Sequence, residues 1–408
     1  MNISKDIYRH MAVWKMAKYV CHFSFLYMVL IFHSVKSTYY ENVSLLHSDL
    51  LTNYNKDIRP ELDLSSRTKV KVGLYLVTLA KLDEIKGQIS IVGFLNLEWT
   101  DNKLNWEPDK YNNVTHTYIP ADKIWKPFLL AGNSVDLPTY VDIKDSPILV
   151  FSNGTVFCPP GVKWNLKCII DTTHFPFDTQ KCSITLIAWP YTSSDIYFIS
   201  MFATAQTEFL MEDVTWELDY TAVTVEDDIS YNPINFDIHF NRRHPYFTVT
   251  LLIPLCFIGV LNILVFKIPT DCGERIGYAI TVLLSVSVFM TIASDLLPPS
   301  SVPHLSYFSI LLIENLILSC LIMISTIYGL NCYHTSPEKP VHSLYHRLVC
   351  SKIQKQNDNH ISESNDVTKT MDTVIWKDVG EMLDKVFFHS YLILLVAIYT
   401  AYIINVVK

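Results

Sequence analysis

One apolar stretch carries polar side chains at a regular spacing, and it offers the clearest chemistry in the sequence. Residues 276–297 hold a single charged side chain, and 22 residues in a helix suffice to cross a bilayer of about 30 Å. Six positions recur at steps of four, three, four, three and four, which places them on one helix face: Gly277, Thr281, Leu284, Val288, Thr291 and Asp295. Lipid gives no reason to align hydroxyls and a carboxylate, whereas a water-filled lumen ringed by copies of this helix does.

Carboxylates lie at both ends of this face, with Asp271 and Glu274 before it and Asp295 at its far end. A ring of such groups concentrates cations and repels anions, and a ring of Leu284 could close the lumen by dewetting. The alternative interpretation is an ordinary buried helix whose hydroxyls bond to its own carbonyls and whose Glu274 is stabilised by the helix dipole. The stretch alone fits both interpretations.

Composition places part of the chain in lipid. Of 408 residues, 50% are hydrophobic and 18% are charged, which is more apolar than an average soluble protein. The net charge of −8 offers no basic stripe for phosphates, so a nucleic-acid partner is not expected. The nine cysteines form no CxxC or spaced Cys/His cluster, so neither a metal site nor another cofactor is predicted. No arrangement of nucleophile, base and oxyanion donors stands out, and we do not expect an enzyme.

Four apolar runs are long enough to span a membrane. They are Tyr246 to Phe266, Ile276 to Leu297, Leu305 to Leu330, and Phe387 to Val407. The first three form a transmembrane segment over 246–330, and 387–408 form the fourth crossing. Four crossings return the C-terminus to the side of the membrane on which the first one starts.

The N-terminal half has the features of a secreted domain. Residues 1–37 hold Lys15 and Lys18, an apolar core and then small residues, which is the layout of a signal peptide. The next segment, 38–245, should therefore enter the secretory lumen. It contains three sequons, which predict glycosylation at Asn42, Asn113 and Asn153.

Segment 38–245 has no long apolar run, and short alternating stretches such as 69–77 and 88–99 recur between turn residues. This pattern predicts an extracellular β-sandwich. An opening helix is predicted at Ser44 to Tyr54, where leucines form a stripe. Turn residues predict hairpins at Ser152 to Thr155 and at Pro159 to Gly161.

Residues 331–386 form a polar connection with the basic bias of a cytoplasmic loop. Its end, near 372–386, carries an amphipathic stripe that predicts a helix able to run into the last crossing.

A tetrapeptide between two cysteines is far more specific than these patterns. Cys168 and Cys182 bracket thirteen residues that include Phe175-Pro176-Phe177-Asp178, and in a secreted domain two cysteines at that distance can close a loop. Together with the stretch at 276–297, this motif resembles the Cys-loop, or pentameric ligand-gated, ion channel family, and most closely nicotinic acetylcholine receptor subunits. Further motifs of the family recur in order: Trp125-Lys-Pro127, Pro159-Pro160-Gly161, Leu251-Leu-Ile-Pro254 and Ser301-Val-Pro303.

The resemblance implies a β-sandwich followed by a four-helix transmembrane bundle, assembled with membrane lipid around it as a homo- or hetero-pentamer of related subunits. It implies a cation-selective channel at the plasma membrane, in the postsynaptic setting of its family, with both termini outside and the helix face above lining the pore. It further implies a disulfide between Cys168 and Cys182. The loop between them, with Phe175 to Asp178, would press on the Ser301 to Pro303 linker near Arg242 and couple ligand binding to gating.

The family's binding site is an aromatic box for a small cationic transmitter such as acetylcholine. By resemblance Trp189 is its central tryptophan, Tyr231 supplies one ring of the cage, and Phe94 is the wall contributed by the complementary face. By position alone, Trp189 also fits a packed strand residue. The tyrosine expected in the first binding loop is Gly132 here, and the adjacent cysteine pair of alpha-type subunits is missing.

These departures indicate a non-alpha or divergent subunit, and they leave a second function open: a non-conducting accessory or trafficking subunit. Two residues fall outside these roles. Cys158 is expected to be a buried small hydrophobe, and Glu314, inside the third apolar run, should face the bundle or a water pocket.

Overall fold

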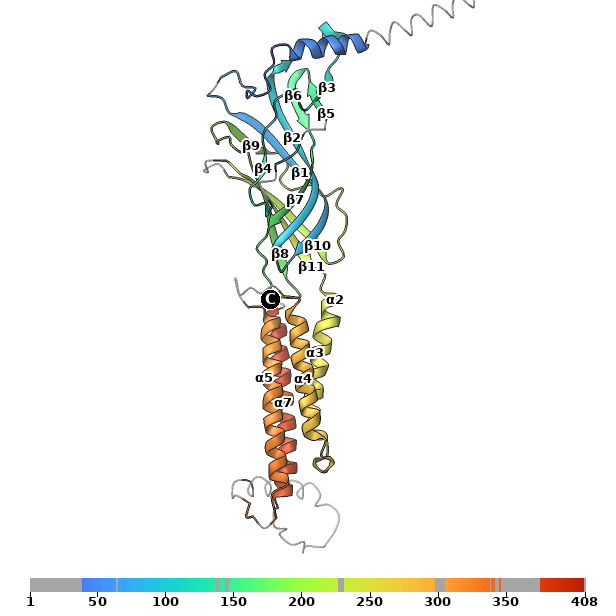
Figure 1. The fold of residues 1–408 in the computed structure, drawn as a ribbon, viewed down its shortest axis with the longest axis vertical. Helices are drawn as coiled ribbons and strands as arrows, with labels where there is room; N and C mark the ends of the chain where they lie inside the picture. The colour runs from blue at the N-terminus through green and yellow to red at the C-terminus, as the bar shows by residue number, and fades with distance from the viewer. Residues whose placement is uncertain are drawn as a thin grey trace, which may run out of the picture.

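The computed structural model describes residues 39–63, 65–136, 140–143, 147–226, 231–297, 305–337, 339–341, 345 and 375–406. A β-sandwich stands above a bundle of long helices, and the two are stacked along the longest axis of the molecule (Figure 1). The predicted signal peptide at 1–37, the linker that contains Pro303, and residues 346–374 lie outside the described residues.

A helix at 39–51 covers the top of the sandwich (Figure 1). It begins and ends earlier than the predicted Ser44 to Tyr54 helix. Leu46 and Leu50 of the predicted stripe are buried in the core of the sandwich, whereas Leu45 is exposed.

The larger sheet has the strand order β3-β5-β6-β2-β1-β9, and β7 pairs with the other half of β2. Burial alternates along β2, as the alternating sequence predicts. The strands are β1 (Thr68–Asp83), β2 (Gln88–Asn105), β3 (His116–Pro120), β5 (Pro147–Phe151), β6 (Asn153–Cys158), β7 (Gly161–Lys167) and β9 (Ile196–Ser200).

The smaller sheet has the order β10-β11-β8-β4, with β4 (Leu130–Ala131), β8 (Thr179–Ile187), β10 (Trp216–Val225) and β11 (Ile234–Arg242). Side chains of both sheets, among them Trp99, Trp164 and Phe236, form one buried core. The predicted β-sandwich is therefore confirmed.

The two predicted hairpins differ in outcome. The turn at Ser152 to Thr155 joins β5 to β6 as an antiparallel pair, so that hairpin is confirmed. The hairpin at Pro159 to Gly161 is wrong, because β6 and β7 both pair antiparallel with β2 and the chain keeps its direction. Prolines lack the N–H that a strand donates, so Pro159 and Pro160 interrupt the pairing without reversing the chain. The carbonyl of Pro160 still accepts the N–H of Leu95 at 3.0 Å.

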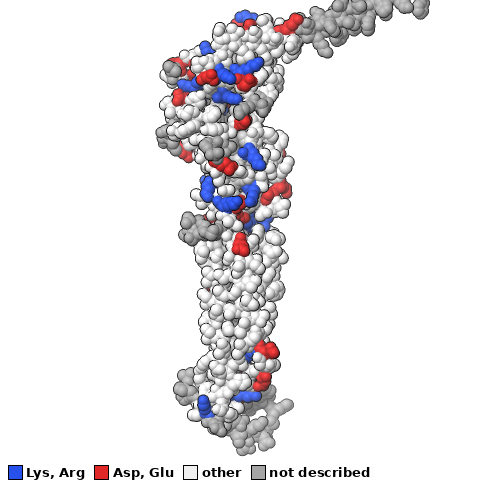
Figure 2. All heavy atoms as spheres, in the orientation of Figure 1, with Lys and Arg blue, Asp and Glu red and all other residues white. Residues whose placement is uncertain are grey.

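Among the described residues, four helices are long and apolar enough to cross a membrane: Pro245–Lys267, Arg275–Ser294, Tyr307–Tyr333 and Trp376–Val406. On the face shown in Figure 2, the charged side chains gather on the sandwich and at the opposite end of the bundle, and the helices between them form an uncharged band. This distribution is the one expected of a multi-pass membrane protein.

The first span is not a uniform helix. It contains α2 (Pro245–Phe247), a π-helical segment at Thr248–Leu252, α3 (Ile253–Ile263) and a 3₁₀ turn at Leu264–Lys267. The π segment lies just before Pro254, whose missing N–H cannot bond to the carbonyl one turn earlier.

The remaining helices are α4 (Arg275–Ser294), α5 (Tyr307–Tyr333) and α7 (Trp376–Val406), with a 3₁₀ turn at Thr270–Cys272 before α4. Helix α4 ends at Ser294, three residues before the predicted Leu297, and Asp295 is its C-terminal cap. Helix α7 contains residues 376–386 of the amphipathic segment and continues without a break through the last apolar run.

Gly93 tests the pairing of the two longest strands. It lies opposite Leu76, where the register of β1 and β2 shifts, and a Cβ atom there would be 2.4 Å from the carbonyl oxygen of Tyr75. Gly93→Ala should therefore lower the free energy of unfolding by about 1–3 kcal/mol, measured by thermal denaturation of the purified chain.

Gly132→Ala is the matched control, because its Cβ would lie 3.6 Å from Thr185, an ordinary contact. It should change the free energy of unfolding by less than about 0.5 kcal/mol. Equal melting temperatures for the two variants would contradict the described register.

Candidate functional site

Two aromatic side chains lie together where the two inner strands of the smaller sheet end. Trp189 follows β8 and Tyr231 precedes β11, and their ring centroids are 5.3 Å apart. The two residues are 41% and 37% exposed, so Trp189 is not a packed strand residue. Two accessible ring faces at this spacing offer a negative quadrupole surface to a cation.

A chain of hydrogen bonds leads from β8 to the turn that carries Tyr231. The Thr185 hydroxyl donates to Asn235 Oδ1 at 2.7 Å, and Asn235 Nδ2 donates to Glu226 Oε1 at 2.8 Å. The N–H of Glu226 donates to the carbonyl of Pro233, two residues after Tyr231. A carboxylate at this turn favours a cationic ligand, and no sequence motif pointed to Glu226.

Gly132 leaves a gap where the family's tyrosine was expected. It directly follows β4, and its N–H donates to the carbonyl of Thr185 at 2.7 Å. A Cβ at Gly132 would have only ordinary contacts, so the backbone has room for a side chain that the sequence does not supply. Gly132 therefore supplies no ring at the position where the resemblance predicts a tyrosine.

Phe94 lies on the other sheet. It belongs to β2, is 47% exposed, and packs above Gly161 of β7. No ring contact joins it to Trp189 or Tyr231 among the residues that the structure describes. One chain therefore brings together two of the three predicted ligand-binding residues and presents the third on a different sheet, as a site shared between neighbouring chains requires.

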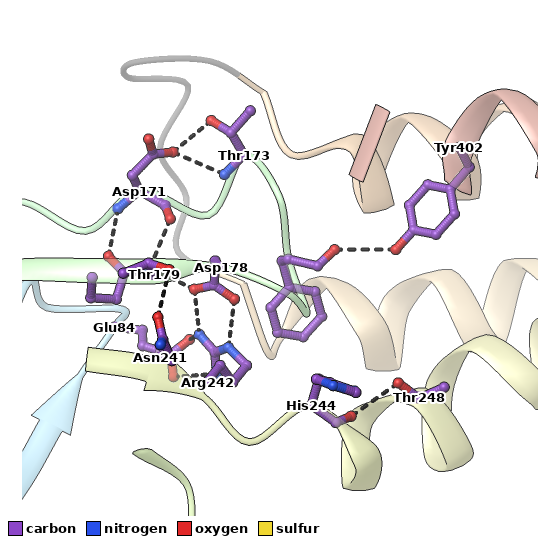
Figure 3. A network of polar contacts seen from close by, with 12 residues as sticks. Glu84, Asp171, Thr173, Asp178, Thr179, Asn241, Arg242, His244, Thr248 and Tyr402 are labelled. Atoms are coloured by element: carbon purple, nitrogen blue, oxygen red, sulfur yellow. Dashed lines mark hydrogen bonds and ion pairs between the residues drawn. The ribbon is translucent and has the colours of Figure 1, made fainter. Parts of the chain in front are cut away.

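At the other end of the sandwich, Arg242 holds the junction with the helices. Its side chain is 1% exposed and forms ion pairs with two carboxylates (Figure 3). Nε donates to Asp178 Oδ1 at 2.6 Å, while Nη1 and Nη2 each donate to a Glu84 oxygen at 2.8 Å. Such bidentate, charge-assisted bonds are the strong ones in proteins.

Aromatic rings complete this environment. The guanidinium carbon of Arg242 lies 4.3 Å from the ring centroid of Trp216, 4.9 Å from that of Phe175 and 5.2 Å from that of Phe247. Burial acts to lower the pKa of Arg242, but Asp178 and Glu84 outweigh it and raise the pKa above its ordinary value. The charge therefore stays in place at every physiological pH.

The predicted disulfide between Cys168 and Cys182 is present, and the loop that it closes contacts the helices. Buried Phe175 packs its ring 5.4 Å from Phe247, before α3, and 5.6 Å from Phe308 of α5. Its carbonyl accepts the hydroxyl of Tyr402, near the end of α7, at 3.2 Å (Figure 3).

The rest of the motif adds to these contacts. Pro176 follows Phe175 through a cis peptide bond, and the half-exposed Phe177 ring lies 4.6 Å from that of His244. The carbonyl of Thr173 accepts the N–H of Tyr307 at 3.0 Å. Pro303, predicted to meet this loop, lies outside the described residues.

Most of the partners at this junction were not predicted from the sequence, among them Glu84, Trp216 and Tyr402. Glu84 is separated from Arg242 by 158 positions and Tyr402 from Phe175 by 227. No local pattern reports contacts over such separations.

Helix α4 turns its polar stripe away from the other helices. All six predicted stripe residues are exposed, with Leu284 at 62% and Val288 at 51%, whereas Ala279, Val282 and Val286 on the other side are buried. Thr281 and Thr291 donate to the carbonyls of Gly277 and Ser287, so the hydroxyls do bond to their own helix. The exposure of the six stripe residues, however, does not fit the alternative interpretation of an ordinary buried helix.

Charges at the start of α4 are sorted by sign. Glu274 is the exposed N-terminal cap, and Gly273 before it has φ +70, a conformation that favours glycine. Arg275 is 1% exposed and points into the bundle, where Nη2 donates to Asp384 Oδ1 at 2.7 Å and Nε to the carbonyl of Val265 at 3.0 Å. The accessible charges of residues 271–275 are therefore acidic, although Arg275 directly follows Glu274 in the sequence.

The comparisons with known proteins match this arrangement. A family profile described as neurotransmitter-gated ion-channel ligand binding domain matches residues 43–244, and one described as neurotransmitter-gated ion-channel transmembrane region matches residues 251–370. The chain belongs to the neurotransmitter-gated ion-channel family.

Similar curated relatives carry acetylcholine receptor names. Neuronal acetylcholine receptor subunit alpha-6 of Pan troglodytes is 31% identical over 320 residues, which are 76% of this chain and 64% of that protein. Subunit alpha-3 of Rattus norvegicus is 29% identical over 71% of this chain and 58% of its own length. Subunit beta-4 of Homo sapiens is 31% identical over 72% and 59%. The chain thus spans just under two thirds of the length of these relatives.

Other predicted residues of this family member are placed as follows. Asn113 lies in an exposed turn, Asn153 is the exposed first residue of β6 and Asn42 lies on the N-terminal helix, and their glycosylation stays a prediction. Cys158 is fully buried, as predicted, and burial raises the pKa of its thiol to about 12. Glu314 is half-buried on α5 beside the buried Asn315, and it forms no ion pair within the described part of the chain.

Arg242 provides the sharpest test of the junction. Arg242→Gln leaves Asp178 and Glu84 buried without their cation, which should cost about 3–5 kcal/mol and remove most of the chain from the cell surface. Arg242→Lys keeps the charge but loses the bidentate geometry. Its loss of stability should therefore lie between that of the unmodified chain and that of Arg242→Gln.

The neighbouring residue is the control. Arg243 is 39% exposed and lies 3.6 Å from Glu212, so Arg243→Gln should cost at most about 1 kcal/mol. Surface labelling and thermal denaturation measure both effects. Equal losses for Arg242→Gln and Arg243→Gln would contradict the role of the buried pair.

Proposed function

We propose that the chain is a subunit of a pentameric, transmitter-gated, cation-conducting channel in the plasma membrane. The observation that carries the proposal is the exposed face of α4, where Thr281, Leu284 and Thr291 are turned away from the bundle. In lipid such a face costs free energy, and five copies around an axis place it on water. The sandwich with its disulfide loop is then extracellular, and so are both termini.

We infer that the transmitter is a small organic cation, with acetylcholine as the first candidate. Trp189, Tyr231 and Phe94 offer exposed ring faces, and the similar relatives are named acetylcholine receptor subunits. The coupling route follows the contacts at the junction. Movement of the sheets reaches the helices through Arg242, Phe175 and Tyr402.

Selectivity for cations follows from the sorted charges at the mouth of α4. Glu274 faces outward, while Arg275 is buried and neutralised by Asp384. Five copies of Glu274 would therefore present a ring of negative charge without the adjacent positive one. We further propose Leu284, the most exposed apolar residue of the face, as the hydrophobic constriction.

Reversal potentials test the selectivity. In sodium and chloride gradients the unmodified channel should follow sodium, and Glu274→Gln should weaken that preference. Glu274→Asp, which keeps the charge, should retain it. A reversal potential that follows chloride in the unmodified channel would refute cation conduction.

The two faces of the sandwich differ in completeness. Phe94 presents an intact wall on the larger sheet, whereas the Trp189 face lacks both a side chain at Gly132 and the adjacent cysteine pair. We propose that the chain serves mainly as the complementary partner of an alpha-type subunit. Its own Trp189 face then need not bind agonist.

Paired substitutions separate the two faces. Co-expressed with an alpha-type subunit, Phe94→Ala should weaken agonist potency about tenfold or more, because one cation–π wall and its packing are lost. Trp189→Ala should change potency little. Phe151→Ala, which removes an exposed ring from β5 far along the same sheet, is the matched control.

The reverse pattern, with Trp189 sensitive and Phe94 indifferent, would show a working principal face. Insensitivity at both positions with preserved surface expression would favour the second candidate function, a non-conducting accessory subunit. The incomplete box at Gly132 is the observation that motivates that candidate.

A further inference from the structure

A pocket of about 290 Å³ lies at the end of the bundle far from the sandwich. Its walls come from three separate parts of one chain: the turn after α3, the end of α5 and the first half of α7. The lining residues used below are Lys267, Asp271, Tyr333, Glu381, Lys385 and Phe388.

The pocket lies at the depth of lipid headgroups. Lys267 ends the first membrane span and Tyr333 ends the third. In α7 no Asp, Glu, Lys or Arg occurs from Ser390 to Val406, so Lys385 is the last such charge before the apolar stretch. Aromatic rings such as Tyr333 and Phe388 are enriched at this border of a bilayer.

The pocket also borders the face that meets lipid. Helix α7 is the least buried of the four spans, and between residues 392 and 404 all of its exposed side chains except Thr400 are apolar, among them Ile393 at 71% and Ile404 at 62%. A helix with such a surface faces hydrocarbon. A lipid whose chains lie along α7 would therefore have its headgroup beside this pocket.

Basic groups in the pocket lack acidic partners. The Lys267 ammonium lies 4.3 Å from the ring centroid of Phe388, and neither it nor Lys385 forms an ion pair with a carboxylate within the described ranges. Asp384, the nearby acid, is already held by Arg275. Two ammonium groups on different elements are thus left for an anionic ligand, and phosphate is the one available at this depth.

Acidic groups line the same pocket. Asp271 accepts the hydroxyl of Tyr333 at 3.2 Å, and Glu381 is exposed on α7. The Lys377 ammonium lies nearby, 5.1 Å from the Tyr333 ring centroid, but neither carboxylate forms an ion pair in the described part of the chain. A purely anionic headgroup would be repelled by these carboxylates. A headgroup that carries both a phosphate and an ammonium satisfies both sets of charges.

We propose that this pocket binds the headgroup of a phospholipid with a primary amine, such as phosphatidylethanolamine. The phosphate contacts Lys267 and Lys385, and the ammonium donates to Glu381 and Asp271. A primary ammonium offers three hydrogen-bond donors, whereas the trimethylammonium of phosphatidylcholine offers none. The site should therefore prefer phosphatidylethanolamine to phosphatidylcholine, although both headgroups are zwitterionic.

The proposal does not depend on channel activity, so its test measures binding. Photoreactive analogues of phosphatidylethanolamine and phosphatidylcholine are incorporated in vesicles with the purified full chain. After illumination, mass spectrometry measures the labelled peptide that covers residues 376–388. The ethanolamine lipid should label this peptide several-fold more strongly than the choline lipid.

Variants assign the preference to the pocket. Lys267→Gln and Lys385→Gln should each lower labelling by the ethanolamine lipid about fivefold, the equivalent of about 1 kcal/mol per lysine near a membrane surface. Glu381→Gln should bring the two lipids closer to equal labelling. Lys339→Gln, near the same end of the bundle but not lining the pocket, should leave labelling unchanged.

Competition separates a lipid headgroup from free phosphate. Unlabelled phosphatidylethanolamine vesicles should displace the probe, whereas inorganic phosphate at millimolar concentration should not. Displacement by phosphate would overturn the lipid assignment. Equal labelling by both lipids, or undiminished labelling by the ethanolamine lipid in a chain that carries both Lys267→Gln and Lys385→Gln, would overturn the site itself.

Discussion

A guanidinium group with 1% exposure has lost its water and must find its full set of partners inside the protein. Arg242 finds them in Asp178, from the disulfide loop, and in Glu84, just after β1. Because removing either partner would leave a buried charge, the last strand of the sandwich, the loop and the end of β1 are held as one unit. The helices begin three residues later, at Pro245.

Lipid imposes the second constraint. The described helices bury their apolar faces in common clusters, and polar side chains also join helices, as where Asn262 Nδ2 donates to Ser319 Oγ at 2.6 Å. Among the described helices, α4 carries aligned hydroxyls on its outward face. The proposed assembly of several copies would place that face on water.

The start of α4 shows that burial decides which charged side chains of a sequence are accessible at the surface. Glu274 and Arg275 are neighbours in the sequence, yet one is exposed and the other is enclosed with Asp384. Of these two neighbours, only the carboxylate presents its charge to the surface. A similar division occurs in the sandwich, where the exposed Phe94 ring and the pair of Trp189 and Tyr231 lie on different sheets.

Local pattern was sufficient for the main elements. Run length predicted the four spans, alternation predicted the strands of the sandwich, and steps of three and four predicted the face of α4, because these periodicities are properties of the backbone itself. The Phe175 to Asp178 tetrapeptide, through its family resemblance, predicted the disulfide between Cys168 and Cys182.

Tertiary structure decided what depends on distant partners. The pairing of β7 with β2 turned a predicted hairpin at Pro159 into a continued strand, since proline blocks a ladder bond but does not choose the chain direction. Glu84 meets Arg242 across 158 positions, and Tyr402 meets Phe175 across 227. The pocket beside Lys267 combines three segments that no local pattern connects. Ion pairs, ring contacts and cavities form between residues that are distant in the sequence. Local periodicity does not indicate which distant residues meet in the folded chain.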